Sequence, residues 1–274
     1  MATTGWSLRG AVLAGVLGLG LAGCAATGET GRGDPATNPP PPQPRFALPD
    51  KPELEPKAVE LLKQMSAKLA AAKTLSFTAV ASYDSLARTG LPLAYMTESE
   101  VTLQRPDKLR VITPADGPAS EFYYDGKTVL AYTPSADLVA KAQAPDTIDA
   151  TLHAAYANAA IYFPFTDVIV SDPWRDLADE LKLAFFVGQS KVEAGITTDI
   201  VVIADNDAQA QIWIGAEDHL PRRIQAYFFS EGGHFRHDVS FSDWKLNAPV
   251  DPGSFTSAKA AAAKQIPFAP PGTN

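Results

Sequence analysis

Apolar residues recur every three or four positions in the stretch that follows Pro52, and charged residues fill the positions between them. The apolar positions of this repeat are Val59, Leu62, Met65, Leu69 and Ala72. This spacing is that of an α-helix with one apolar face. We therefore expect an amphipathic helix between Pro52 and Lys73 that packs against another part of the fold.

The apolar period then changes to two, which is typical of a strand with one buried face. The alternating residues are Leu75, Phe77, Ala79, Ala81 and Tyr83. Four further strands are predicted at Leu93 to Gln104, Leu109 to Thr113, Glu121 to Tyr124 and Thr128 to Tyr132. The Asp125-Gly126 pair favours a tight turn between the last two.

A helical segment is expected between Pro145 and Leu181. Asp146 can cap a first helix, whose apolar stripe is Ile148, Leu152, Ala155 and Ala159. Asp172-Pro173 combines a capping side chain with a first-turn proline and predicts the start of a second helix. The aromatic segment Ile161 to Phe165 between them must bend at Pro164 and still bury its rings.

Strand patterns resume after the helical segment. They cover Leu183 to Val192, Thr197 to Ala204, Gln209 to Ile214, Arg222 to Phe229 and His234 to Trp244. The short connections are consistent with antiparallel hairpins throughout. A helix, five strands, a helical insertion and five more strands predict a mainly β (α+β) fold, a single large curved sheet with helices on its inner face.

The N-terminus has the layout of a secretory signal. Arg9 precedes an apolar run from Ala11 to Ala22 that is too short to span a bilayer. The run ends in Leu21-Ala22-Gly23-Cys24, which resembles the lipobox of bacterial lipoproteins and implies cleavage before Cys24 and lipid on its thiol. Cys24 is the single cysteine of the chain, so no internal disulfide can form. The alternative is an incidental cysteine in an ordinary signal peptide.

Four segments follow from this composition: a signal peptide (1–23), a lipidated tether (24–51), a folded domain (52–268) and a flexible tail (269–274). The tether is rich in Gly, Pro, Thr and Ala and includes Pro39-Pro40-Pro41-Pro42. At about 3.1 Å per extended residue it can hold the domain some tens of Å from a membrane. A proline-rich ligand for another protein is the alternative use of this segment.

Charge narrows the choice of partners. The chain has 23 basic and 31 acidic residues, and removal of the signal peptide takes away Arg9 alone, leaving 22 and 31 and a net charge of about −9. An acidic surface argues against nucleic acid and against polybasic membrane docking. We expect a monomer held at the periplasmic face of a bacterial membrane by lipid on Cys24. Because Ala25 is not aspartate, the resemblance to well-studied lipoproteins implies the outer membrane.

Several motifs resemble the LolA-like periplasmic lipoprotein carriers, in the same order along the chain. They are Val101 to Arg110 with its Arg105-Pro106 pair, Asp125 to Tyr132, Gln211 to Ile214, Leu220 to Ile224 and Phe241 to Asn247. The segments Tyr162-Phe163-Pro164, Ser171-Asp172-Pro173 and Leu220-Pro221-Arg222-Arg223 are similar to a bacterial family of this kind, domain of unknown function 2092. The resemblance covers Pro56 to Phe268.

This resemblance implies an incomplete antiparallel β-barrel of about ten to eleven strands, with helices closing the concave side over an apolar cavity for acyl chains of lipids or lipoproteins. The candidates to line that cavity are Phe77, Tyr95, Phe163, Trp213 and Trp244. A packed core is the alternative, and the sequence does not separate the two. Arg105 matches the arginine that holds the lid of the carriers shut, which implies hydrogen bonds to carbonyls between Asp146 and Phe165. The alternative is an exposed arginine before a turn.

Nothing in the sequence indicates catalysis, a metal or a cofactor. His234 and His237 lie three apart on a predicted strand and so point to opposite faces, which argues against a shared metal ion with Asp238. There is no Gly-x-Ser-x-Gly elbow, phosphate-binding glycine loop or dinucleotide fingerprint. We expect a non-enzymatic carrier of acyl chains, with a non-catalytic envelope scaffold or sensor and a cofactor-free enzyme as alternatives.

Overall fold

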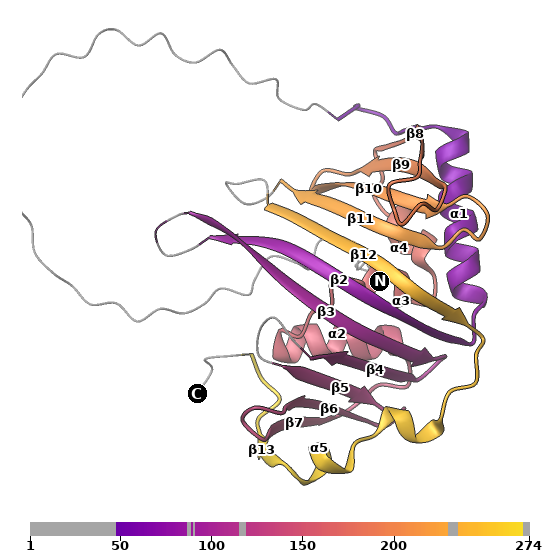
Figure 1. The fold of residues 1–274 in the computed structure, drawn as a ribbon. Helices are drawn as coiled ribbons and strands as arrows, with labels where there is room; N and C mark the ends of the chain where they lie inside the picture. Colours follow the sequence, from indigo (N-terminus) through magenta and orange to yellow (C-terminus); the bar gives the residue numbers. More distant parts are fainter. Residues whose placement is uncertain (1–47, 87–88, 90, 115–118, 230–234, 271–274) are drawn as a thin grey trace, which may run out of the picture.

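The computed structural model describes residues 48–86, 89, 91–114, 119–229 and 235–270. The lipobox, Cys24, the tether up to residue 47 and residues 271–274 lie outside this range, as does His234. One 13-stranded sheet dominates the fold, in the order β1-β8-β9-β10-β11-β12-β2-β3-β4-β5-β6-β7-β13. The helices between Pro56 and Ala178 cover one face of this sheet (Figure 1).

Helix α1 (Pro56–Ala71) confirms the expected amphipathic segment. Pro56 occupies the first turn, where its missing N–H costs no hydrogen bond. Its apolar stripe, which includes Leu62, Met65 and Leu69, is buried. The helix lies against β8, β9, α3 and α4.

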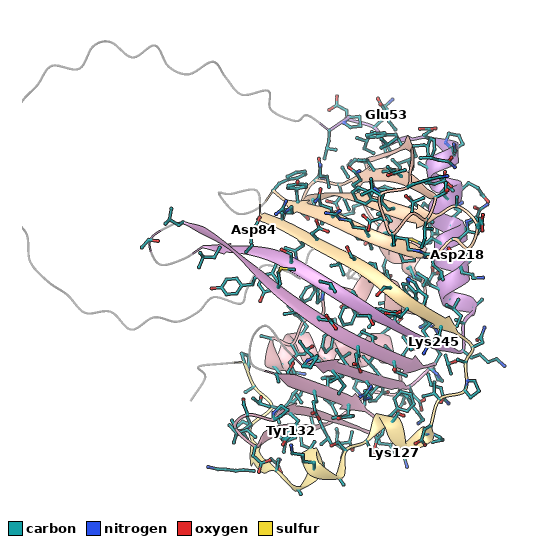
Figure 2. The ribbon with its side chains drawn as sticks, viewed as in Figure 1. Glu53, Asp84, Lys127, Tyr132, Asp218 and Lys245 are labelled. Carbon is teal, nitrogen blue, oxygen red and sulfur yellow. The ribbon has the colours of Figure 1, made fainter. Side chains whose placement is uncertain are left out.

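The centre of the sheet is the long hairpin of β2 (Thr74–Leu86) and β3 (Pro92–Gln104). A meander follows through β4 (Lys108–Thr113), β5 (Ser120–Tyr124), β6 (Thr128–Thr133) and β7 (Leu138–Gln143). The hairpin extends beyond its neighbours (Figure 1), and Asp84 and Lys245 mark opposite ends of the central strands in Figure 2. Alternate residues of β2 from Leu75 to Ala81 are buried, as their period of two predicts.

The helical insertion consists of α2 (Ile148–Ala159), α3 (Thr166–Ile169) and α4 (Pro173–Ala178). Asp172 caps α4 as predicted, since its carboxylate accepts a hydrogen bond from the Arg175 N–H at 3.1 Å. The predicted cap of α2 was wrong by one residue. Thr147, not Asp146, accepts from the Ala150 N–H, because the helix begins at Ile148. No helix within the described ranges is long and apolar enough to cross a bilayer.

The second half of the sheet contains β8 (Leu183–Ser190), β9 (Thr198–Ala204), β10 (Ala208–Gly215), β11 (Pro221–Phe228) and β12 (Phe235–Leu246). These strands pair antiparallel in chain order. β12 then pairs with β2, which joins the two halves into one sheet.

The strand number differs from the expected ten to eleven. Three strands were not predicted: β1 (Glu53–Leu54), β7 and β13 (Lys264–Ile266). The ten predicted strands all pair antiparallel, as expected. β1 and β13 instead pair in parallel with β8 and β7. Strands of two or three residues are too short to show a period, yet they cover backbone groups that an edge would expose.

Two apolar clusters hold the sheet in place. The large one fills the concave face beneath α1 to α4. The small one lies on the opposite face of the meander and includes Tyr123, Tyr132 and Ala260. It places α5 (Ala258–Ala262), which follows the short helix η2 (Pro252–Phe255), against β6 and β7. The predicted fold class, a mainly β curved sheet with helices on its inner face, is confirmed.

Candidate functional site

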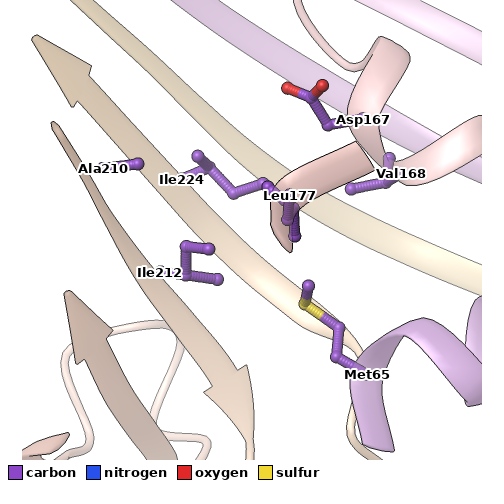
Figure 3. Close-up of a pocket in the computed structure, with 7 residues that line it drawn as sticks. All are labelled: Met65, Asp167, Val168, Leu177, Ala210, Ile212 and Ile224. Carbon is purple, nitrogen blue, oxygen red and sulfur yellow. The ribbon is translucent and has the colours of Figure 1, made fainter. Parts of the chain in front are cut away.

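A small cavity lies where α1, α3 and α4 meet strands β10 and β11 (Figure 3). Asp167 is the one ionisable residue among those that line it. The six others are Met65, Val168, Leu177, Ala210, Ile212 and Ile224. The cavity is therefore an apolar space with a carboxyl group at its wall.

The cavity is small in the conformation described. Its empty volume is about 270 Å³ with the part open to solvent included. Most of that volume is too narrow for a molecule, and the remaining space would hold about one water molecule. Pockets for small molecules usually have about 300–1,000 Å³. An acyl chain can therefore fit here only if the helices move away from the sheet.

Asp167 is the second residue of α3, so its position follows from the bend at Pro164 and the short helix after it. The residue is half-buried. Burial raises the pKa of Asp167 to about 7, and the nearby charge of Asp176 acts in the same direction. Within the part of the chain that the structure describes, no group donates a hydrogen bond to this carboxyl.

Two ionisable neighbours of Asp167 are Tyr162, which stays neutral, and Asp176, which adds negative charge. Burial raises the pKa of the Tyr162 hydroxyl, and the charge of Asp167 raises it further. Asp176 on α4 is paired, because the Arg175 Nε donates to its Oδ1 at 3.1 Å. Arg175 is thus already engaged by Asp176, while Asp167 lies at one end of the group of lining residues (Figure 3).

Arg105 connects the sheet to the helical insertion. Its Nη1 donates to the Ile169 carbonyl at 3.1 Å, and its Nη2 donates to the Val170 carbonyl at 2.9 Å. Burial lowers the pKa of this guanidinium, and its Nε has no partner among the described residues. The expected carbonyls between Asp146 and Phe165 were the wrong ones. The carbonyls at the end of α3 are available because the last turn of a helix leaves its C=O groups unpaired.

Two further polar contacts, neither of them predicted, join α2 to the segment before α4 and α4 to α1. The Asp149 carboxylate accepts hydrogen bonds from the Ser171 N–H at 3.0 Å and from the Ser171 hydroxyl at 2.5 Å. Ser66 on α1 accepts from the Trp174 N–H at 2.8 Å. Ser66 occupies a buried position among apolar residues of α1, and that polar residue within an apolar face was the available signal.

Three of the aromatic candidates meet in one cluster on the concave face. The ring of Phe77 lies 4.5 Å from that of Trp244 and 5.8 Å from that of Phe165, measured between centroids. Phe163 lies 5.5 Å from Phe165 and 5.2 Å from Phe122. These rings pack against one another, so in this conformation they form core.

Tyr95 and Trp213 do not line the interior, which corrects the expectation for both. Tyr95 is 46% exposed and stacks on Tyr83 at 5.7 Å between centroids. Trp213 lies on the outer face, with the Arg223 guanidinium 5.3 Å from its ring centre. On β10 the inward positions are Ile212 and Ile214, so Trp213 must point outward.

Of His234, His237 and Asp238, only the last two lie within the described residues. His237 and Asp238 are adjacent on the strand and face opposite sides. Asp238 is bound by Arg223, whose Nε donates to Oδ1 at 2.8 Å. Burial lowers the pKa of His237. Across the described ranges, no group of three or more His, Cys, Asp or Glu residues is placed to hold a metal ion.

The chain was compared with known proteins. The model of a family described as predicted periplasmic protein (DUF2092) matches residues 58–269. A search of curated proteins found no match.

Among solved structures, the MucA/MucB complex of Pseudomonas aeruginosa contains a chain that is 17% identical, with a TM-score of 0.42. The match covers 74% of this chain and 62% of that one, less than two thirds of its length. LprF from Mycobacterium bovis is 15% identical (TM-score 0.44; 72% and 96% covered). A LolA superfamily protein from Nitrosomonas europaea is 9% identical (TM-score 0.33; 73% and 97% covered). All three scores are below 0.5, so they establish neither a shared site nor a shared function.

Proposed function

Because the chain belongs to the DUF2092 family of predicted periplasmic proteins, we propose that it is a lipid-anchored periplasmic protein that binds acyl chains of lipids or lipoproteins. The chains would lie between the concave face of the sheet and the helices that cover it. The anchor would be lipid on Cys24, which the tether separates from the folded domain. The outer membrane is the proposed location, since Ala25 follows the cysteine.

The observation that carries this proposal is the construction of the interior. An extended apolar sheet face is covered by an insertion of three short helices. A few polar contacts attach that insertion to the rest of the fold, among them those of Arg105 and Ser66 and the hydrogen bond from the Ile148 N–H to the Pro106 carbonyl at 2.8 Å. Short segments with few polar attachments are the part of a fold that opens at low cost. Separation of α3 and α4 from β10 and β11 would enlarge the cavity that already lies between them.

The apolar surface so exposed can supply the binding energy. Burial contributes about 25 cal/mol per Å² of apolar surface. Two acyl chains that each bury a few hundred Å² would give on the order of 10 kcal/mol before ordering costs, enough for micromolar binding. The net charge of about −9 offers no general attraction for anionic head groups, so selection must come from the apolar part.

Binding is tested with the full chain carrying Cys24→Ser and a fluorescent fatty-acyl probe. We expect saturable binding with weak salt dependence. Phe163→Asp should weaken it, because a charge would enter the ring cluster beneath the insertion. Trp213→Ala on the outer face is the control and should bind as the parent does. Absence of binding at probe concentrations up to about 100 μM would refute acyl-chain binding.

Anchoring is tested separately with labelled palmitate and membrane fractionation. Cys24→Ser should abolish label incorporation and membrane attachment, while the domain stays folded because its core begins after the tether. Label in the Cys24→Ser variant, or none in the parent protein, would refute the anchor.

A non-catalytic envelope scaffold or sensor is the second candidate, and the filled interior favours it. Native mass spectrometry of the protein purified without harsh detergent separates the two functions. Copurified lipid supports the carrier, and a protein without lipid that also binds no acyl probe supports the scaffold. Turnover of a copurified lipid would instead indicate a cofactor-free enzyme.

A further inference from the structure

We propose that Asp167 selects the cargo by its head group, and that the preferred ligand is a lipid or other long-chain amphiphile whose polar end carries an ammonium group. This inference rests on the proposed acyl-chain binding and names the chemical class of the ligand. The apolar wall of the cavity would hold the chain, and the carboxylate would accept hydrogen bonds from the ammonium.

The lining of the cavity offers a polar end of a ligand few partners. Its α1 and sheet contributions, including Met65, Ala210 and Ile224, are apolar and offer no partner to a head group. Asp167 is the one lining residue that can bind a polar end, and its acceptors are unoccupied by described residues. A ligand that inserts its chain along this wall can therefore pair its polar end with a lining side chain only at Asp167.

The charges around Asp167 decide the sign of the head group. The ionisable groups that face it are Tyr162 from the preceding segment and Asp176 from α4, and Asp176 is occupied by Arg175. A second carboxylate placed here would meet uncompensated repulsion. An ammonium group would supply the missing counter-charge and three hydrogen-bond donors.

The energetic state of Asp167 fits this assignment. An ionised carboxyl group among apolar side chains is unfavourable unless it is paired. The raised pKa of Asp167 reflects that cost in the unliganded protein. A bound cation removes the cost, so cation binding should be linked to release of the proton from Asp167.

The experiment compares dodecylammonium with dodecanoate, which share a chain and differ in the sign of the head group. Both displace the fluorescent acyl probe from the full chain carrying Cys24→Ser, below their micelle concentrations and at about pH 8, where Asp167 is ionised. We expect the ammonium compound to bind about tenfold or more tightly than the carboxylate. Asp167→Asn should abolish the preference, and Asp176→Asn should retain it as the control.

The pH dependence provides a test that needs no substitution. At about pH 5.5 Asp167 is protonated in the free protein, so the preference for dodecylammonium should shrink several-fold relative to about pH 8. Dodecanol, which has no charge, should bind equally at both pH values.

The outcomes separate this inference from the function on which it rests. Equal binding of both compounds, or a preference that survives in Asp167→Asn, would overturn the role of Asp167 and leave acyl-chain binding in place. Failure of all three compounds and of the acyl probe would overturn acyl-chain binding itself. If Asp167→Asn does not fold, an unchanged preference between the two pH values in the parent protein overturns the inference.

Discussion

The two halves of the concave face are built from different side chains. Beneath α2 and α3, the strands β2, β5 and β12 contribute aromatic residues, and the cluster includes Phe77, Phe122, Phe241 and Trp244. Beneath α4, the strands β10 and β11 contribute the smaller Ala210, Ile212 and Ile224. The described cavity lies in the aliphatic half.

This difference explains how one apolar face can be both core and candidate site. Large rings interlock at centroid distances of 4.5–5.8 Å and leave little free volume. Small aliphatic side chains leave a cavity. Asp167 is among its lining residues, and no described group donates a hydrogen bond to its carboxyl group. Arg105 is attached at the end of α3, between the two halves. Opening should therefore begin on the aliphatic side and leave the aromatic side closed.

The largest expected effect is the loss of a ring from the aromatic half. Phe165 is 1% exposed and contacts the rings of Phe77 and Phe163. Phe165→Ala should lower the free energy of unfolding by about 3–5 kcal/mol, because the truncation leaves a cavity that the neighbouring rings cannot fill. Ile224→Ala should cost less, about 2 kcal/mol, because Ile224 is only half-buried and its side chain is smaller. Urea unfolding measures both, and equal losses would refute the contrast between the halves.

The connection between the halves is tested at Arg105. Arg105→Leu removes two hydrogen bonds from a charged donor, which together contribute on the order of 2–3 kcal/mol. Amide exchange in residues 166–171 should accelerate about tenfold or more, while exchange in β2 stays unchanged. Arg110→Leu, which removes a half-exposed ion pair with Glu100, is the control. Unchanged exchange in α3 would show that Arg105 does not hold the insertion.

The carboxyl group of the aliphatic half makes stability depend on pH. The pKa of Asp167 is about 7 in the folded protein and about 4 in an unfolded chain. Between these values the folded chain binds more protons, so the contribution of Asp167 to the free energy of unfolding falls as pH rises from about 4 to about 7. Asp167→Asn removes this loss and should stabilise the protein by about 1–3 kcal/mol at about pH 8, allowing for partial solvent access.

The same variant should show almost no gain at about pH 3, where the carboxyl group is mostly neutral in both states. Thermal melts of both proteins across this range measure the difference. A gain that is equal at both pH values would mean that shape, and not charge, accounts for it.

The smallest effect is expected outside both halves. Tyr95 lies on the exposed part of β3 and contacts Tyr83. Tyr95→Ala should lower the free energy of unfolding by less than about 1 kcal/mol, in line with other exposed positions. Urea unfolding of this variant sets the baseline for the two halves. A loss above about 2 kcal/mol would place Tyr95 within the core.

The sequence predicted the elements with long periodic patterns. Helix α1 and strand β2 follow from apolar spacing alone, because a face repeated over several turns or residues must be buried. The cap at Asp172 follows from local chemistry. The short edge strands β1 and β13 show no such pattern, since their pairing depends on the neighbouring strand and not on their own residues.

In the candidate site too, the sequence predicted one residue and the tertiary structure revealed another. Arg105 was identified as a link to the insertion, but its partners depend on where α3 ends. Asp167 was not identified, because a single aspartate beside an aromatic segment has no sequence signal that distinguishes it from a solvated one. Its importance arises from residues of α1, β10 and β11 that are far from it in the chain.

Trp213 and Trp244 show what the sequence determines and what depends on the tertiary structure. The alternation along β10 by itself determines that Trp213 faces outward, beside the inward Ile212 and Ile214. The same alternation on β12 would turn Trp244 outward as well. An irregularity between Ser242 and Lys245, with Asp243 at a φ of 56°, shifts the register and brings Trp244 against Phe77. Local patterns thus determine which face a regular strand buries. The position of a bulge depends on tertiary packing, here the burial of the Trp244 ring against Phe77.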